Sequence, residues 1–250
     1  MVDEADYWDS VAEKTKYVNN PFFAHKKREL EKLVSKWLTN AKGRVLKTDL
    51  FQEAFSFDYI LFSGSKVTGI DISPKIVWAA SKRVRGERFV ISDVREMCFK
   101  DDSFDIVFSN STLDHFPEVD KAMSEIFRVL KPNGKAIITI ENKTNPMLYI
   151  LNKIMKKTLS KPFYTEDCYS IFDMKKRMRR IGFRVEKTGA IIHIPPLVPT
   201  LLNMIYKNRT HRVLGPFLCG VIRFLEFVGD LETPLNYITG YLVAVMGVKK

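Results

Sequence analysis

The chain has 250 residues, of which 46% are hydrophobic and 28% charged, a balance that excludes disordered and fibrous proteins. The three cysteines, Cys98, Cys168 and Cys219, have the spacing of neither zinc ligands nor a disulfide framework, so we expect no metal site and a reducing, cytoplasmic setting. The N-terminal residues lack the pattern of a signal peptide, and no apolar run is long enough to predict a membrane span.

The net charge of +11 is concentrated in the second half of the chain. Residues 1–120 carry 18 basic and 20 acidic side chains, whereas residues 121–250 carry 22 basic and 9 acidic ones. A basic half of this kind favours contact with a phosphate-bearing substrate, a membrane surface or nucleic acid. A basic surface that meets only water would give the same count.

The first third of the chain predicts helices followed by a strand. Apolar residues recur at helical spacing over residues 7–40, and Asn20-Pro21 predicts a break into two helices. A short strand is expected at 44–47. The pattern at 50–63 indicates a helix and part of a connection, which Gly64 ends.

Strands and helices then alternate as far as residue 140. The expected strands are 66–71, 89–91, 104–108 and 135–140, and the expected helices are 74–85 and 118–130. This alternation predicts a parallel sheet with helices on both faces, which binds ligands outside the carboxyl ends of its strands. The candidate ligand positions at those ends are Lys47–Asp49, Asp71, Asp93 and Asn110–Ser111.

Beyond residue 140 the pattern changes to amphipathic helices with basic faces, expected at 146–157 and 166–181. A strand is expected from residue 183 to about residue 194, and a last strand at 240–246. The segment between them, 197–235, is apolar and interrupted by prolines and glycines.

Four stretches of the chain follow one another in the order and spacing of a known family. They are Val67–Pro74, Val90–Asp93, Ser103–Asn110 and Arg128–Gly134. Together they resemble the motifs of the class I S-adenosylmethionine-dependent methyltransferases. The resemblance implies a doubly wound, Rossmann-like, mostly parallel α/β sheet with an antiparallel last strand, and S-adenosylmethionine as cofactor. It also implies that the acid after the second strand binds the ribose hydroxyls and that the acid after the third binds the adenine amino group.

The resemblance divides the single domain, 1–250, into three parts. Residues 1–43 form a helical cover, 44–140 the cofactor-binding core and 141–250 the substrate-side half with the insert 197–235. In relatives the N-terminal segment often folds over the cofactor, and here it carries the aromatic rings of Tyr7, Trp8 and Tyr17. Ordinary helix packing would also explain these rings.

The first motif of the family is altered in this chain. The family has an acid at the end of the first strand and then glycines at alternate positions, whereas here Lys47 replaces the acid, and Asp49, Phe51 and Glu53 replace the glycines. One hypothesis is that Lys47 faces the methionyl carboxylate of the cofactor and Asp49 its ammonium group. The other is that cofactor binding has been lost and the fold kept for another role. We favour the first, because the acids after the next two strands remain.

The resemblance implies a cofactor site made by residues that follow four of the strands. These residues are Lys47, Thr48, Asp49, Asp71, Ile72, Asp93, Val94, Asn110 and Ser111. His115 is the candidate catalytic base, which is needed only if the accepting atom must lose a proton, although it could simply pack at the start of a loop. His193 is a weaker candidate, because a histidine on a strand is more often part of the core. Glu141-Asn142, at the end of the fifth strand, is placed to line the acceptor site.

The insert 197–235 is the best indication of the acceptor. It interleaves apolar residues with the cations of Lys207, Arg209, Arg212 and Arg223, which favours a lipid-like acceptor with an anionic group, or docking at a membrane surface. A cap that packs on its own domain or on a second subunit of a homodimer is an equal alternative. The predicted function is methyl transfer from S-adenosylmethionine to a small or lipid-like acceptor.

Parts of the sequence would also fit two other functions. The altered first motif leaves room for a non-catalytic relative that binds a ligand or a partner protein. The basic second half would suit an RNA-modifying enzyme. However, its cations lie mostly on helix faces, and Asn110–Leu113 lacks the Asn-Pro-Pro-Tyr type of motif that base-methylating relatives use. We therefore expect no nucleic-acid substrate. The absence of a glycine-rich turn argues against a nicotinamide oxidoreductase.

Overall fold

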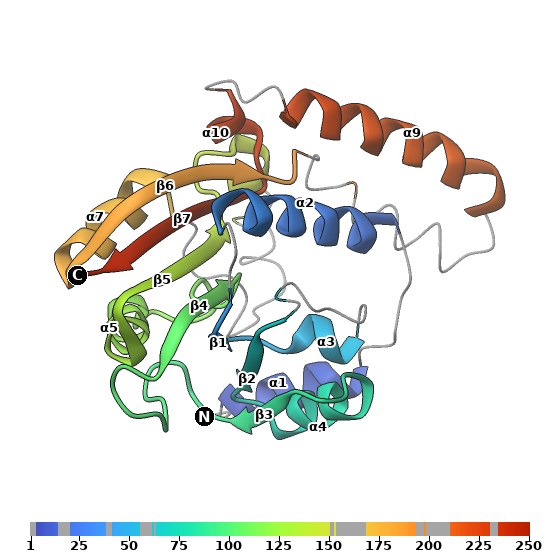
Figure 1. Cartoon of the computed structure of the whole chain (residues 1–250). Coiled ribbons are helices and arrows are strands. Elements are labelled where there is room, and N and C mark those ends of the chain that lie inside the picture. The colour runs from blue at the N-terminus through green and yellow to red at the C-terminus, as the bar shows by residue number, and fades with distance from the viewer. Residues whose placement is uncertain are drawn as a thin grey trace.

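Figure 1 shows the protein as a computed structural model, which describes residues 4–14, 21–38, 42–55, 62, 64–150, 153, 169–193, 198, 211–230 and 235–250. Seven strands form one sheet in the order β3-β2-β1-β4-β5-β7-β6. They are β1 (Arg44–Lys47), β2 (Lys66–Asp71), β3 (Arg88–Ile91), β4 (Phe104–Asn110), β5 (Leu130–Glu141), β6 (Phe183–Ile191) and β7 (Leu242–Lys249). The first five strands pair in parallel, and β7 runs antiparallel to both β5 and β6. The predicted mostly parallel sheet with an antiparallel last strand is confirmed.

The strand order reverses beside β1, and this reversal positions the site. The chain moves outward from β1 through β2 to β3 and then returns to the other side of β1 with β4. In open sheets of this kind the two connections diverge at the reversal and leave a crevice outside the carboxyl ends of the strands.

Helices cover both faces of the sheet (Figure 1). They are α1 (Glu4–Lys14), α2 (Pro21–Trp37), α3 (Phe51–Phe55), α4 (Pro74–Arg83), α5 (Val119–Val129), α7 (Ile171–Ile181), α9 (His211–Asp230) and α10 (Asn236–Thr239). Alternate residues of β4 face opposite sides, because side chains on a strand alternate. Val107 packs in the cluster that contains residues of α5 and α7, whereas Ile106 and Phe108 pack in the cluster that contains residues of α2 and α9.

Most element boundaries lie close to the predicted ones. Helix α4 begins at Pro74 as expected, and the Ser73 hydroxyl accepts a hydrogen bond from the Ile76 amide at 3.1 Å. Helix α7 begins at Ile171 rather than 166, because Ser170 and Asp173 form a capping box there. Strand β5 begins at Leu130, five residues before the expected start at 135.

Parts of other predicted helices lie outside the described residues. The helix expected at 50–63 is described as α3 over 51–55, and most of 56–63 is not described. Half of the residues of 146–157 and the first part of the insert 197–235 also lie outside the described residues. Within the described ranges, no helix combines the length and hydropathy that a membrane crossing requires.

Candidate functional site

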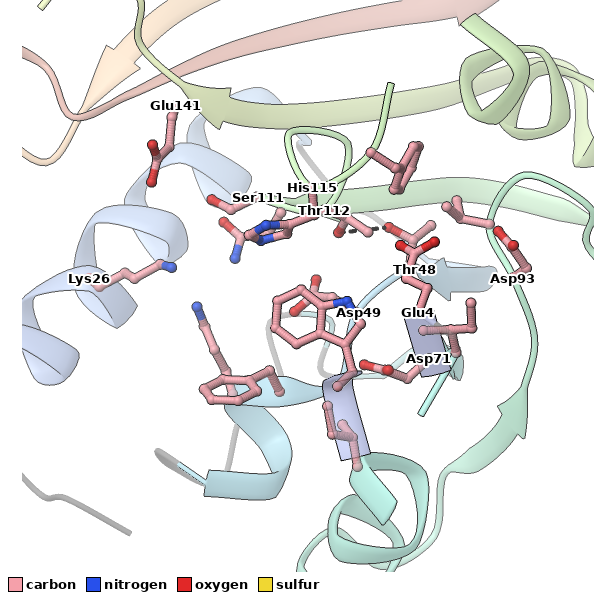
Figure 2. Close-up of a pocket in the computed structure, with 18 of the residues that line it drawn as sticks. Glu4, Lys26, Thr48, Asp49, Asp71, Asp93, Ser111, Thr112, His115 and Glu141 are labelled. Carbon is pink, nitrogen blue, oxygen red and sulfur yellow. Dashed lines mark hydrogen bonds between the residues drawn. The ribbon is translucent and has the colours of Figure 1, made fainter. Parts of the chain in front are cut away.

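A cavity of about 340 Å³ lies outside the carboxyl ends of the parallel strands, at the reversal of strand order (Figure 2). Its wall includes eight of the nine predicted cofactor residues and the candidate base. These residues are Thr48, Asp49, Asp71, Ile72, Asp93, Val94, Asn110, Ser111 and His115. The fold therefore brings together residues that are more than 60 positions apart in the sequence.

Asp71 ends β2 and presents its carboxylate to the cavity. One oxygen accepts a hydrogen bond from the Ser73 amide at 3.0 Å, and the other accepts one from the Leu50 amide at 3.1 Å. Each oxygen keeps a second lone pair, which a hydroxyl group can occupy. Burial raises the pKa of Asp71 to about 6, although the two amides favour the ionised form.

Asp93, after β3, belongs to an ion-pair network that the sequence did not reveal. The Arg95 guanidinium donates to both Asp93 oxygens, with Nη2 at 2.7 Å from Oδ2, and also to Glu4 of α1 at 2.6 Å and Glu118 at 3.2 Å. Burial acts to raise the pKa of Asp93, but the hydrogen bonds and charge of Arg95 hold it below its ordinary value. The network fastens α1 to the cavity wall.

Helix α1 contributes residues to the cavity wall. Glu4 and Trp8 are part of the wall, and the Trp8 ring packs edge-on against His115 with centroids 4.9 Å apart. Asp9 accepts hydrogen bonds from the Ser73 hydroxyl and, at 3.1 Å, from the Lys75 amide. The predicted aromatic rings at Tyr7 and Trp8 lie in contact with each other, 5.3 Å apart, and Tyr17 lies outside the described residues.

The altered first motif forms a compact polar network behind the cavity wall. The Lys47 ammonium is buried and donates to the Asp49 carbonyl at 3.0 Å, to the Asp49 carboxylate at 3.3 Å and to the Glu53 carboxylate at 3.0 Å. Burial lowers the pKa of Lys47, but the two carboxylates outweigh burial and raise it above its ordinary value. Burial and the charge of Asp49 raise the pKa of Glu53 against the attraction of Lys47.

The position of Lys47 differs from the expected one. The sequence prediction has Lys47 facing the cofactor, but in the structure its side chain is 4% exposed and is not part of the cavity wall. The Asp49 carbonyl and the carboxylates of Asp49 and Glu53 together use the three protons of the ammonium group. Asp49 and Thr48, by contrast, do line the cavity, and the Thr48 hydroxyl lies 3.4 Å from that of Thr112.

Several polar atoms near the end of β4 are buried and have no hydrogen-bond partner among the described residues. They include Nδ1 of His115 and Oγ of Ser111. Ser111 also has a φ of 50°, a left-handed conformation that is uncommon for serine. Unsatisfied polar atoms and backbone strain concentrate where a ligand completes the hydrogen bonding.

The far end of the cavity is formed by residues of β5 and α2 and by Tyr241, which directly precedes β7. Glu141 lines the cavity as predicted and accepts a hydrogen bond from the Tyr241 hydroxyl at 3.1 Å. Lys26 of α2 also lines it and was missed, because in the sequence it is one basic residue among several on an amphipathic helix. Asn142 instead ties β5 to α10, since its amide donates to the carbonyls of Tyr237 at 2.8 Å and Gly240 at 2.9 Å.

His193 has a structural role, which was the alternative to a catalytic role in the sequence analysis. It is buried outside the cavity wall, with Nδ1 3.0 Å from the Thr239 hydroxyl and Nε2 3.3 Å from the Ala190 carbonyl. Both ring nitrogens are therefore used within the fold.

The fold and the cavity together define a Rossmann-like α/β protein whose site suits an adenosine-containing ligand. The wall offers carboxylates after β2 and β3 and apolar side chains, Ile72 and Val94, directly after each of them. A family profile described as "Methyltransferase domain" matches residues 52–138.

Relatives and solved structures support the same class. The chain is 38% identical over 85 residues to phosphoethanolamine N-methyltransferase 2 of Caenorhabditis elegans. This match covers 32% of this chain and 20% of that protein. It is 35% identical over 89 residues to demethylmenaquinone methyltransferase of Lactobacillus johnsonii, covering 33% and 36% of the two chains. The match therefore spans only about a fifth to a third of these relatives.

The fold matches more broadly than the sequence. The structure of Haemonchus contortus phosphoethanolamine N-methyltransferase 2, in complex with phosphomonomethylethanolamine and S-adenosylhomocysteine, superposes with a TM-score of 0.63 at 20% identity, covering 100% of this chain and 60% of that one. A possible histamine N-methyltransferase of Thermotoga maritima gives a TM-score of 0.58 at 18% identity, with 91% of each chain covered. The chain therefore shares the fold of these methyltransferases, and its sequence similarity to the methyltransferase domain covers residues 52–138.

Proposed function

We propose that this protein transfers the methyl group of S-adenosylmethionine to a small or lipid-like acceptor. The observation that carries the proposal is the Asp71 carboxylate, held by two backbone amides at the cavity wall with a free lone pair on each oxygen. A carboxylate in this state can accept hydrogen bonds from both hydroxyls of a ribose.

The cavity wall also offers groups that suit the other parts of the cofactor. Ile72 and Val94 offer apolar surface for an adenine ring beside Asp93. Asp49, on the same wall, supplies a carboxylate for the methionyl ammonium group. When bound, the cofactor supplies an electrophilic methyl group on a sulfonium.

The residues of the chain contribute mainly by position. Methyl transfer needs the accepting atom in line with the methyl group, so holding both partners in one cavity provides most of the rate enhancement. His115, whose Nδ1 is buried at the wall without a partner in the described part of the chain, is placed to accept a proton from the acceptor. Trp8 fixes the orientation of the imidazole through its edge-on contact.

Helix α9 supports the lipid-like part of the proposal. Phe217, Phe224 and Phe227 are 63% to 71% exposed and lie on one side of the helix, whereas Ile222 is buried on the other. Three exposed phenylalanines on one helix face suit an apolar acceptor or a membrane surface. The relatives include enzymes named for phosphoethanolamine, sterol and demethylmenaquinone substrates.

The test is binding followed by transfer. Calorimetric titration with S-adenosylmethionine and S-adenosylhomocysteine should show saturable binding that Asp71→Ala weakens strongly. Incubation with methyl-labelled cofactor and a panel of hydroquinones, phosphoethanolamine and sterols should then label one class of acceptor. If the folded protein binds neither cofactor form, the proposal is wrong and the non-catalytic alternative replaces it.

A further inference from the structure

Lys26 is the one Lys or Arg side chain among the described residues that line the cavity. It lies on α2, is half-buried, and has no hydrogen bond or ion pair within the described part of the chain. Figure 2 shows its ammonium group pointing into the cavity, on the side of Glu141 and away from Asp93. A half-buried ammonium without a partner is costly, so a ligand that supplies an anion there would be stabilised.

The surroundings of Lys26 are acidic. Burial lowers its pKa, and the carboxylates of Asp49, Asp114 and Glu141 act against this, with Asp49 the strongest of the three. All three carboxylates have partners of their own, since Asp49 accepts from Lys47, Asp114 from the Glu141 amide and Glu141 from Tyr241. The electrostatic coupling with Asp49 indicates that the cavity offers one cation and one carboxylate within range of each other.

A pair of opposite charges on one wall complements a zwitterion. The methionyl end of the cofactor is an α-amino acid, with one ammonium and one carboxylate group. Lys47 is buried behind the wall and its ammonium protons are all used. The first motif therefore offers no cation to the methionyl carboxylate of the cofactor. Asp71 and Asp93 suit the nucleoside end, which directs the methionyl end toward Asp49.

We propose that Lys26 binds the methionyl carboxylate of S-adenosylmethionine while Asp49 binds its ammonium group, so that a lysine from α2 replaces the role predicted for Lys47. This inference rests on the proposed function, because it requires the cofactor to bind in this cavity. It also makes α2 part of the cofactor site, so cofactor binding would fix this helix over the sheet.

The test compares two ligands that differ only in the amino acid group. S-Adenosylhomocysteine has the carboxylate and the ammonium group, whereas 5′-methylthioadenosine has neither. Calorimetry on the full chain should show that Lys26→Gln weakens S-adenosylhomocysteine binding roughly 10- to 100-fold, the loss expected for a charged hydrogen bond, and leaves 5′-methylthioadenosine binding unchanged. Lys26→Arg should restore most of the affinity.

Lys27→Gln is the matched control, because Lys27 lies on the same helix and pairs with Glu31 at 3.7 Å. It should bind both ligands as the natural protein does. Equal affinity of Lys26→Gln and the natural protein for S-adenosylhomocysteine would overturn the inference, and a raised KM for the acceptor would then assign Lys26 to an anion on the acceptor. Equal loss for both ligands would also overturn it. Failure of the natural protein to bind S-adenosylhomocysteine would instead reject the proposed function itself.

Discussion

Asp71→Asn should weaken cofactor binding and at the same time remove a pH-dependent cost to stability. The carboxylate is placed to accept two ribose hydroxyls, each bond to a charged group contributing about 1.5–3 kcal/mol. Asparagine keeps one acceptor oxygen and loses the charge, so we expect a net loss of about 2–3 kcal/mol. This loss corresponds to about 30- to 150-fold weaker binding of S-adenosylhomocysteine.

The effect on stability follows from the raised pKa of Asp71. Its pKa is about 6 in the folded protein, whereas an aspartate in an unfolded chain titrates near 3.9. Between these values the folded state holds a proton that the unfolded state has released, so the free energy of unfolding falls as pH rises. The difference of about 2 pH units corresponds to at most about 3 kcal/mol, lost between about pH 4 and pH 6.

Urea unfolding of the ligand-free protein at pH values from about 4 to 7 measures this pH-dependent loss of stability. The natural protein should lose stability relative to Asp71→Asn across that range, and above it the gap should stay constant. Asp102→Asn is a matched control, since Asp102 lies far from the cavity, pairs with Lys249 at 2.8 Å and has a φ of 53° that asparagine tolerates. Parallel stability curves would refute the raised pKa of Asp71, and unchanged affinity for S-adenosylhomocysteine would refute its assignment as the ribose-binding carboxylate.

Three further substitutions test other parts of the site. His115→Asn should lower kcat by about 100-fold or more while leaving S-adenosylhomocysteine affinity unchanged, and a kcat within about threefold of the natural value would remove the base from the mechanism. Lys47→Met should reduce the free energy of unfolding by about 3–5 kcal/mol, because it leaves two carboxylates without their cation. Urea unfolding measures this loss, which Glu53→Gln in the same chain should partly reverse, and a cost below about 1 kcal/mol would show that the buried network is unimportant. Arg95→Ala should release α1, seen as faster proteolysis within that helix and about tenfold weaker cofactor binding, whereas Lys121→Ala, an exposed control, should change neither.

The sheet could be predicted because its strands carry local signals. The run from Lys66 to Asp71 ends in an acid and is followed by Ser73 as an N-cap, which is enough to place a strand, a turn and a helix. The start of β5 was missed because Pro132, Asn133 and Gly134 indicate a turn. In the structure they lie inside the strand, where Asn133 has a φ of 63° and the pairing with β4 shifts register. Turn residues end a strand in most sequences, so the pattern alone could not show that pairing continues around them.

The carboxyl-end residues of the site were predictable for the same reason, whereas its cover was not. Any polar residue directly after a parallel strand lies near the crevice, which identified Asp49, Asp71 and Asp93. Lys26 reaches the cavity only because α2 packs against the sheet with that face inward. Such docking depends on contacts between distant segments, and a single sequence does not show them.

The altered first motif shows why a glycine-rich turn is dispensable in this chain. Glycines are needed where φ is positive or where a Cβ would collide. No residue from Arg44 to Phe55 has a positive φ, so the loop after β1 needs no glycine for its conformation. A glycine is needed instead on β2, because a Cβ on Gly69 would lie 2.4 Å from the Leu50 side chain.

The loop after β1 is held by its own charges. Leu50 packs against Gly69 and donates its amide to Asp71, while the Lys47 ammonium holds Asp49 and Glu53 from behind. The network therefore fixes two cavity carboxylates, Asp49 through its side chain and Asp71 through the Leu50 amide. A glycine loop places backbone close to the ligand, whereas this loop places a carboxylate there, and a carboxylate suits the ammonium group of an amino acid. The same substitution removes a backbone cradle for the carboxylate end of that amino acid, and in the proposed arrangement Lys26 of α2 supplies a cation there instead.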